Sequence, residues 1–218
     1  TLQQINKALM LRFFRILITL IALPFLLPNC STNDIPPRIL IFSKTEGYRH
    51  DCIPIATAAL RKLCLANGIA VDTTEDAADF NTKNLKRYNT VVFLCTTGDV
   101  LNPAQETEFQ RYIQAGGGYV GIHSATDTEY GWTWYGGLVG GYFNGHPAQQ
   151  NATLHIENHD HPATKHLPGN EWKRFDEWYN FKDLNPNVKV LLTLDESTYE
   201  GGTNGAVHPA SWSQEYDG

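Results

Sequence analysis

The sequence predicts an α/β fold with a doubly wound, mostly parallel sheet, and two observations carry this prediction. Short apolar runs of strand length recur at 39–42, 91–95 and 119–122. Segments with helical apolar spacing lie between them, at 54–68 and 103–115. Continuous apolar runs are typical of strands buried on both faces. Strands and helices that alternate at these lengths build parallel sheets, whose ligand sites lie beyond the carboxyl ends of the strands.

The first unit runs from the strand at 39–42 through a polar loop into a helix. Pro54 suits the first turn of this helix and Gly68 its end, because proline fits an N-terminal turn and glycine a left-handed exit. A weaker strand follows at 69–73. This order is typical of a β-loop-α unit.

The helix at 103–115 has the most clearly marked ends. Asn102 can cap the free amides of its first turn, and Gln105 stands where a capping box needs an amide side chain. Gly116 supplies the left-handed exit. The strand at 119–122 follows at once.

The second half of the chain is rich in Gly, Trp, Tyr, His and Asn. Strands are predicted at 152–156, 172–179, 188–194 and 207–212, partly antiparallel, with glycine-rich turns between them. We expect these strands to extend the same sheet and not to form a second domain.

Composition and charge narrow the possible functions. The chain has 17 Lys+Arg against 23 Asp+Glu, a formal net charge of -6, and no block of basic residues. Because binding to a phosphate backbone depends on basic side chains, nucleic acid is not expected as a partner. The 5 Trp, 10 Tyr and 10 Phe residues suit either a pocket that stacks on a sugar or an ordinary core.

Residues 1–30 have the pattern of an export signal. Three basic residues precede an apolar run over 16–27, which is too short to span a membrane comfortably. Cys30 follows, so the segment resembles a bacterial lipoprotein signal with Cys30 as the lipidation site. Cleavage elsewhere and an uncleaved anchor are the alternatives. We expect an exported protein, periplasmic or anchored in the cell envelope, that meets the membrane only through this segment.

Residues 31–37 are polar and are predicted to be a linker, so the folded domain is expected over 38–218. Apart from Cys30, the cysteines are Cys52, Cys64 and Cys95, an odd number without CxxC spacing. A disulfide scaffold is therefore not expected.

The end of the strand at 119–122 is the most informative point for chemistry. Gly121 and Ala125 flank His123 and Ser124, and small residues around a polar one are what a sharp strand-to-helix elbow needs. A histidine there can act as a base, an acid or a metal ligand, and it can also simply cap a turn. Ser124 could serve as a nucleophile, although it stands one residue from the apex.

Six motifs along the domain, in this order, are similar to those of the ThuA-like (trehalose utilisation) family. They are IFSKTEGYRH at 41–50, GGGYVGIHSA at 116–125, GGYFNGHP at 140–147, HPAT at 161–164, DEWY at 176–179 and HPASW at 208–212. The resemblance covers about residues 38–218. It implies a flavodoxin-like fold similar to class I glutamine amidotransferases, with their cysteine replaced. It also implies a role in carbohydrate metabolism, on keto-disaccharides or glycosides.

Carried over by position, the resemblance implies a histidine-rich pocket. We expect His123, Glu177 and His208 to be catalytic, and His50 and His146 to bind the substrate. Family members normally continue into one more strand beyond the last motif, so we also expect that a C-terminal strand is missing from this sequence.

The pocket residues admit two kinds of chemistry. His50, His123 and His146 could hold a divalent ion such as zinc, or the same imidazoles could perform acid/base chemistry without a metal. The spacing of these histidines in the sequence does not distinguish metal binding from metal-free chemistry, because they lie on separate loops. A glycosidase pair at Asp176 and Glu177 is disfavoured, because adjacent residues on a strand point to opposite faces.

Four aromatic residues complete the expected substrate site. They are Tyr130, Trp132, Tyr179 and Trp212. The first two, with their neighbours at 134 and 135, suit a wall over the pocket and suit a plain core cluster equally well.

Three functions follow from these residues. The leading one is an enzyme that acts on a small-molecule carbohydrate through His123. The second is a carbohydrate-binding protein without turnover. The third is an amidotransferase-like hydrolase that uses Ser124 or Cys52.

Overall fold

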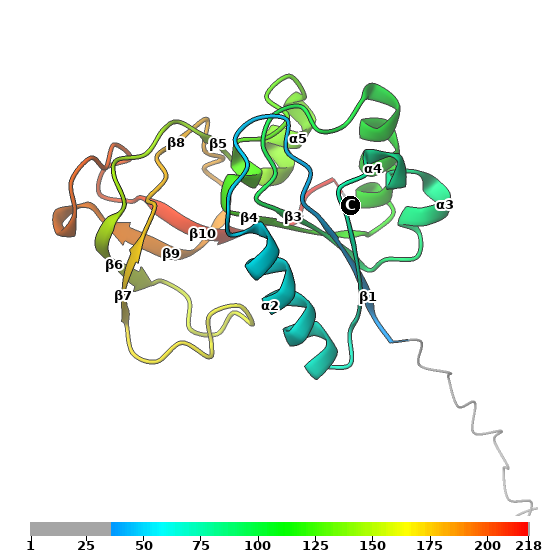
Figure 1. The fold of residues 1–218 in the computed structure, drawn as a ribbon. Coiled ribbons are helices and arrows are strands. Elements are labelled where there is room, and N and C mark those ends of the chain that lie inside the picture. Colours follow the sequence, from blue (N-terminus) through cyan, green and yellow to red (C-terminus); the bar gives the residue numbers. More distant parts are fainter. Residues whose placement is uncertain (1–35, 218) are drawn as a thin grey trace, which may run out of the picture. The chain divides into compact units, whose positions relative to one another are not determined.

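The computed structural model describes residues 36–217, and four parallel strands form its central sheet (Figure 1). They are β1 (Arg38–Phe42), β2 (Ala70–Thr74), β3 (Thr90–Leu94) and β4 (Gly118–Ile122), in the order β2-β1-β3-β4. This is the predicted α/β arrangement, in which the strand order reverses between β1 and β3. In open parallel sheets, ligands bind at the carboxyl edge near such a reversal.

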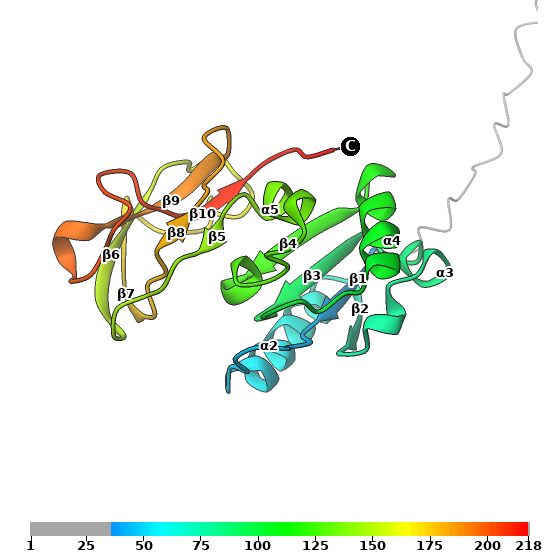
Figure 2. The same ribbon diagram turned by 90° about the horizontal axis from the view of Figure 1, so that it is seen from above.

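Helices cover both faces of the central sheet (Figure 2). Helix α2 (Ile53–Ala66) lies on one face, and α3 (Thr82–Leu85) and α4 (Pro103–Gln114) lie on the other. Alternate residues of β1 serve the two faces: Ile41 packs in the cluster of α2, whereas Phe42 packs in the cluster of α4 with Phe109. The apolar runs of β1 and β3 therefore reflect burial on both sides.

The predicted ends of α4 are confirmed. The Asn102 side chain accepts hydrogen bonds from the backbone of Ala104 at 3.0 Å and of Gln105 at 3.1 Å, while the Gln105 side chain accepts from the backbone of Asn102 at 2.9 Å. Gly116 leaves the helix with a φ of +90°. The capping box thus fixes the start of α4, and Gly116 ends the helix just before β4.

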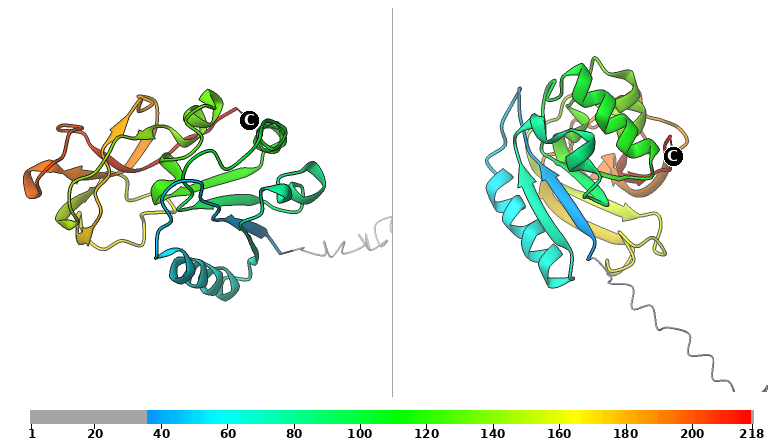
Figure 3. Two further views of the ribbon diagram at one scale, coloured as in Figure 1. Left: turned by 45° about the horizontal axis from the view of Figure 1, so that its top comes forward. Right: turned by 90° about the vertical axis from the view of Figure 1, so that its right-hand side faces the viewer.

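The C-terminal strands form a second, antiparallel sheet, so the expectation that they extend the central sheet is wrong (Figure 3). The order is β10-β9-β6-β7, with β6 (Gln150–Ile156), β7 (Glu171–Asp176), β9 (Lys189–Asp195) and β10 (Pro209–Ser213). This sheet has its own apolar cluster, around Leu154, Leu194 and Trp178. Strands that bury a face against their own cluster do not need the parallel sheet as a partner.

Short elements connect the two sheets. Helix α5 (Thr133–Val139) leads into β5 (Tyr142–Phe143), which pairs in antiparallel fashion with β8 (Phe181–Lys182). Strand β4 is the outermost strand of the central sheet among the described residues, and Val120 on it is 43% exposed. A buried strand was expected at 119–122, and this expectation is wrong, because β4 is partly exposed.

The predicted export signal, its Cys30 and most of the predicted linker lie outside the described residues. Between residues 36 and 217, none of the helices has the length and apolar character that a membrane span requires.

Candidate functional site

The candidate site lies at the carboxyl ends of the parallel strands. It also includes side chains from the segment that follows β7 of the antiparallel sheet. His50 stands on the loop between β1 and α2, and His123 comes directly after β4. Glu177 and Tyr179 come directly after β7. The site therefore exists only when the two sheets are packed together.

The chain bends sharply at His123. Its φ is +55°, in the left-handed region that residues with a side chain rarely adopt. A Cβ atom at Gly121 would lie 2.7 Å from the Tyr119 hydroxyl and 3.1 Å from the Ala125 Cβ, so a larger residue there would have to displace the Tyr119 ring. Such a conformation costs about 1–3 kcal/mol and occurs most often at functional sites. The elbow projects an imidazole, as the sequence suggested.

Three side chains converge so that their donor atoms form a triangle. The His50 and His123 Nε2 atoms are 3.1 Å apart, and Glu177 Oε2 lies 3.2 Å from His123 Nε2 and 3.9 Å from His50 Nε2. Ligands about 2.1 Å from a tetrahedral zinc ion are about 3.4 Å from one another. The triangle therefore has the size of one face of a zinc coordination shell.

Neighbouring groups orient the rings around the triangle. The His50 Nδ1 atom faces the buried Ser124 hydroxyl at 3.4 Å. His146 donates from Nδ1 to the Pro147 carbonyl at 2.8 Å, which leaves its Nε2 atom 3.4 Å from Glu177 Oε1. A hydrogen bond at one ring nitrogen fixes which nitrogen stays free to bind a metal or accept a proton. His146 thus approaches the triangle through the second oxygen of Glu177.

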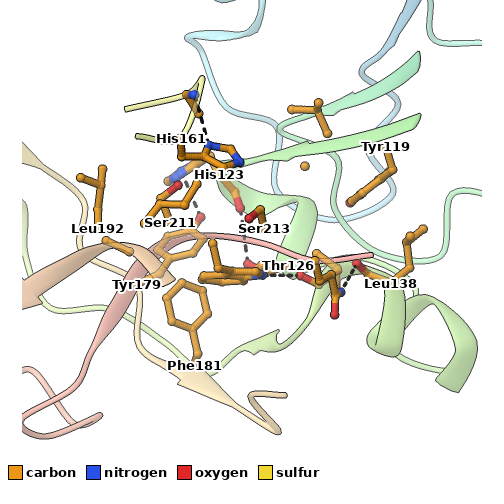
Figure 4. Close-up of a pocket in the computed structure, with 18 of the residues that line it drawn as sticks. Tyr119, His123, Thr126, Leu138, His161, Tyr179, Phe181, Leu192, Ser211 and Ser213 are labelled. Carbon is orange, nitrogen blue, oxygen red and sulfur yellow. Dashed lines mark hydrogen bonds between the residues drawn. The ribbon is translucent and has the colours of Figure 1, made fainter. Parts of the chain in front are cut away.

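Tyr179 packs beside His123, one member of the triangle (Figure 4). Its hydroxyl lies 3.0 Å from His123 Nε2 and 3.4 Å from His50 Nε2. The centre of its ring is 4.4 Å from that of His123 and 4.3 Å from that of Phe143. Burial, reinforced by the charge of Glu177, raises the pKa of Tyr179 far above its ordinary value. The hydroxyl therefore stays protonated and can donate a hydrogen bond.

Burial also decides the charge state of the two central histidines. It lowers the pKa of His50 and of His123 below the ordinary value, and it outweighs the opposing charge of Glu177. The neighbouring His50 lowers the pKa of His123 further. Both rings are therefore neutral at pH 7 and have a lone pair for a metal ion or a proton.

A cavity of about 930 Å³ opens beside the triangle. His123, Glu177 and Tyr179 line it together with residues of β4 and of the second sheet. Figure 4 shows Tyr179 beside His123, with the Phe181 ring next to Tyr179. The site thus combines polar donors with an aromatic wall, which is typical of small-molecule pockets.

His208, which the sequence suggested as catalytic, lies apart from the triangle. It is fully buried, and its Nε2 atom donates to the Tyr179 carbonyl at 2.8 Å. Its Nδ1 atom lies 2.8 Å from Glu196 Oε1. His208 therefore holds the backbone of Tyr179 at the border of the cavity and has no contact with the other histidines, which favours a supporting role over a catalytic one.

The predicted aromatic residues divide between the site and the core. Trp132 packs on Phe109 and Tyr135 in the core beside α4, so it does not join the site as expected. Trp212 lines the cavity and donates to the Val139 carbonyl at 2.8 Å.

Tyr130 reaches the rim of the site. Its hydroxyl donates to Asp127 at 2.6 Å and lies 3.2 Å from the Phe143 carbonyl. Phe143 itself was not predicted, although its ring contacts both Tyr179 and His146. Its only signal in the sequence is its place three residues before His146.

Comparisons with known proteins agree with this fold. A family model described as ThuA, trehalose utilisation, matches residues 38–218. The crystal structure of a ThuA-like protein from Bacteroides uniformis ATCC 8492 is similar with a TM-score of 0.71 and 27% identity, over 85% of this chain and 81% of that one. A second, from Parabacteroides merdae ATCC 43184, has a TM-score of 0.67 and 20% identity, over 84% and 76% of the two chains. No curated protein matches the chain.

Proposed function

Because this chain belongs to the ThuA family of trehalose utilisation, we propose that it is a carbohydrate-active enzyme that binds a zinc-class ion through His50, His123 and Glu177. The substrate in this proposal is a disaccharide or glycoside, including forms oxidised to a ketone. The reaction takes place where the triangle meets the aromatic ring of Tyr179.

The size of the triangle carries the proposal. Three donor atoms from three separate segments are 3.1, 3.2 and 3.9 Å apart. Two neutral imidazole nitrogens and a carboxylate oxygen are not stabilised by lying this close unless a proton or a cation lies between them. A zinc-class ion is a cation that such a set of donor atoms binds. Both imidazoles have the lowered pKa that favours a free lone pair. A bound ion would polarise a carbonyl or hydroxyl oxygen of the sugar.

The chain's own residues supply the remaining functions. With the ion on His123 Nε2, the protonated Tyr179 hydroxyl, 3.0 Å from that atom, can donate a hydrogen bond to a sugar oxygen. The Tyr179 ring, beside Phe143, offers an apolar surface for a sugar ring. His146, on the exposed side, faces the second oxygen of Glu177 and can pass protons between that carboxylate and solvent. Ser124 is fully buried, which argues against its use as the nucleophile of a hydrolase.

Zinc binding tests the proposal directly. We expect the purified domain to bind zinc with a 1:1 stoichiometry in isothermal titration with ZnCl₂ at pH 7. His123→Ala and Glu177→Gln should each weaken the affinity at least tenfold, because each removes one of three ligands.

His155→Ala is the matched control, because His155 is half-exposed on β6 and pairs with Asp195 at 3.4 Å, away from the triangle. Its zinc affinity should equal that of the unmodified protein. Equal affinities in the His123 and His155 variants would exclude the triangle as the metal site.

Turnover separates the enzyme from a binding protein. A panel of glycosides and keto-glycosides, including trehalose, should yield a product with the unmodified protein and none with His123→Ala. A protein that binds a sugar of the panel but converts none would support the second function. Activity that persists in His123→Ala but is lost in Ser124→Ala or Cys52→Ala would support a hydrolase.

We further propose that the protein works outside the cytoplasm. The basic and apolar pattern over residues 1–30 supports export, and Cys30 is the proposed lipidation site. Cell fractionation of the full chain should place it in the envelope, and Cys30→Ser should release it from the membrane fraction. Recovery of both forms in the cytoplasm would contradict the proposal.

A further inference from the structure

Two cysteines lie side by side at the edge of the candidate site. Cys52 stands at the start of α2 and Cys95 directly after β3, and their sulfur atoms are 3.9 Å apart. Both are free thiols in this structure. The sequence did not suggest the pair, because 42 residues separate them and a tertiary contact alone brings them together.

The pair is attached to both central histidines through the backbone. Cys52 follows His50 by two residues, on the same loop. The backbone N–H of Cys95 donates to the carbonyl of Ile122 at 3.1 Å, and Ile122 directly precedes His123. A change in the distance between the two sulfur atoms therefore acts on the two chain segments that position the histidines.

The two thiols differ in access to solvent. Cys52 is exposed, whereas Cys95 is buried at 2% exposure. Burial, together with the neighbouring Cys52, raises the pKa of Cys95 to about 12. An oxidant from solvent therefore reaches Cys52 first, and Cys95 stays a protonated thiol until its partner has been activated.

We propose that Cys52 and Cys95 form a reversible disulfide when the protein meets a hydroperoxide, and that this bond reshapes the histidine site. In the first step the Cys52 thiolate attacks a peroxide oxygen, the O–O bond breaks, and Cys52 becomes a sulfenic acid while hydroxide leaves and takes up the thiol proton. In the second, the Cys95 sulfur attacks the Cys52 sulfur, the S–O bond breaks, and the departing hydroxide takes the Cys95 proton. Two thiols are oxidised by two electrons, and one hydrogen peroxide is reduced to two waters.

The new bond requires local movement. A disulfide holds its sulfur atoms about 2.05 Å apart, so the pair must approach by almost 2 Å from its present separation. Side-chain rotation can supply part of this approach, and the loop that carries His50 supplies the rest, because Cys95 is enclosed by the core of α2 and β3. The effect on metal binding rests on the proposed function, whereas the formation of the bond does not.

Peptide mapping tests the bond itself. The reduced, metal-free protein is treated with an equimolar amount of hydrogen peroxide, its remaining thiols are alkylated, and its peptides are analysed by mass spectrometry. We expect a peptide pair linked through Cys52 and Cys95, two hydrogens lighter than the reduced pair. The linked pair should be absent in Cys52→Ser, which changes an exposed position, and present in Cys64→Ser, which changes a buried cysteine of the same core. Oxidation of Cys52 without this link, or a link to another cysteine, would overturn the proposal.

Zinc titration tests the consequence. Peroxide treatment should change the zinc affinity of the unmodified protein at least tenfold, should leave that of Cys52→Ser unchanged, and should be reversed by dithiothreitol. An oxidised protein with the mapped link and unaltered zinc affinity would overturn the effect on the site. If neither redox form binds zinc, the proposed function fails, and the peptide map still decides whether the disulfide forms.

Discussion

The position of His208 predicts that this residue maintains the fold and does not take part directly in the reaction. In His208→Ala, the Tyr179 carbonyl loses its partner at 2.8 Å, whereas Glu196 Oε1 keeps the backbone N–H groups of Asn204 and Gly205. An unsatisfied buried acceptor costs about 1–3 kcal/mol. Removal of the ring also leaves a cavity of about 60 Å³, which adds about 1.4 kcal/mol at 24 cal/mol per Å³. We therefore expect a loss of about 3 kcal/mol.

Urea unfolding followed by tryptophan fluorescence measures this loss. In a domain of this size, 3 kcal/mol corresponds to a decrease in Tm of about 9 °C. The matched control is His155→Ala, whose half-exposed ion pair with Asp195 contributes at most about 1 kcal/mol. A free energy of unfolding for His208→Ala within about 0.5 kcal/mol of that of the unmodified protein would refute the reasoning. A variant that loses turnover at unchanged stability would also refute it, because that result would assign His208 a direct role in the reaction.

Two further predictions concern the loops and helices that support the site. Glu129 is buried, accepts hydrogen bonds from the backbone of Val100 and Leu101, and has a pKa that burial raises from 4.5 to about 7. Between pH 4.5 and 7, the Glu129 carboxyl group is therefore protonated in the folded state and ionised in the unfolded state. Because ionisation of Glu129 in the folded state is unfavourable, the free energy of unfolding should fall by about 1–3 kcal/mol as the pH rises from 5 to 8. Asn102→Ala removes the cap of α4 and should lower the free energy of unfolding by about 1 kcal/mol.

Unfolding experiments check both. Glu129→Gln mimics the protonated carboxyl group, so its stability relative to the unmodified protein should improve between pH 5 and pH 8. An identical difference at the two pH values would contradict the raised pKa. For the cap, Asn102→Asp keeps an acceptor at the same place and should retain most of the stability. Equal losses in the Asp and Ala variants would show that the cap does not contribute.

Much of the central sheet could be predicted because the signals are local. A strand buried on both faces must be apolar at consecutive positions, and β1 and β3 show this directly. The capping box of α4 needs two residues three positions apart, so it is visible in the sequence alone. The bend at His123 could be inferred in the same way from its small neighbours.

The second sheet could not be placed by such signals. Alternation predicted its strands near their observed positions, but the partner of a strand depends on residues far away in the chain. Trp172 on β7 is exposed, whereas Leu154, its neighbour on β6, is buried. The sequence predicts a strand at both positions and does not show which side chain is buried. The separate apolar cluster of this sheet decided that it does not continue the parallel one.

The site histidines were also predicted only in part from the sequence. The resemblance to the ThuA family assembled His50, His123, His146 and Glu177 from four distant motifs, and the structure brings these four together. It also added His208 from the motif at 208–212, which by its pattern alone looks much like the one that contains His146. Burial and two hydrogen bonds give His208 a structural position instead.

The sequence by itself determined the alternation of strands and helices, the ends of α4, the family and most of the residues around the pocket, because each of these depends on the types of neighbouring residues. Only the tertiary structure decided that the strands form two sheets, that the donor atoms of three side chains stand about 3 to 4 Å apart, and that Cys52 meets Cys95. Those features depend on how distant segments pack, and distances between such segments are set by side-chain volume and register, which no local pattern records.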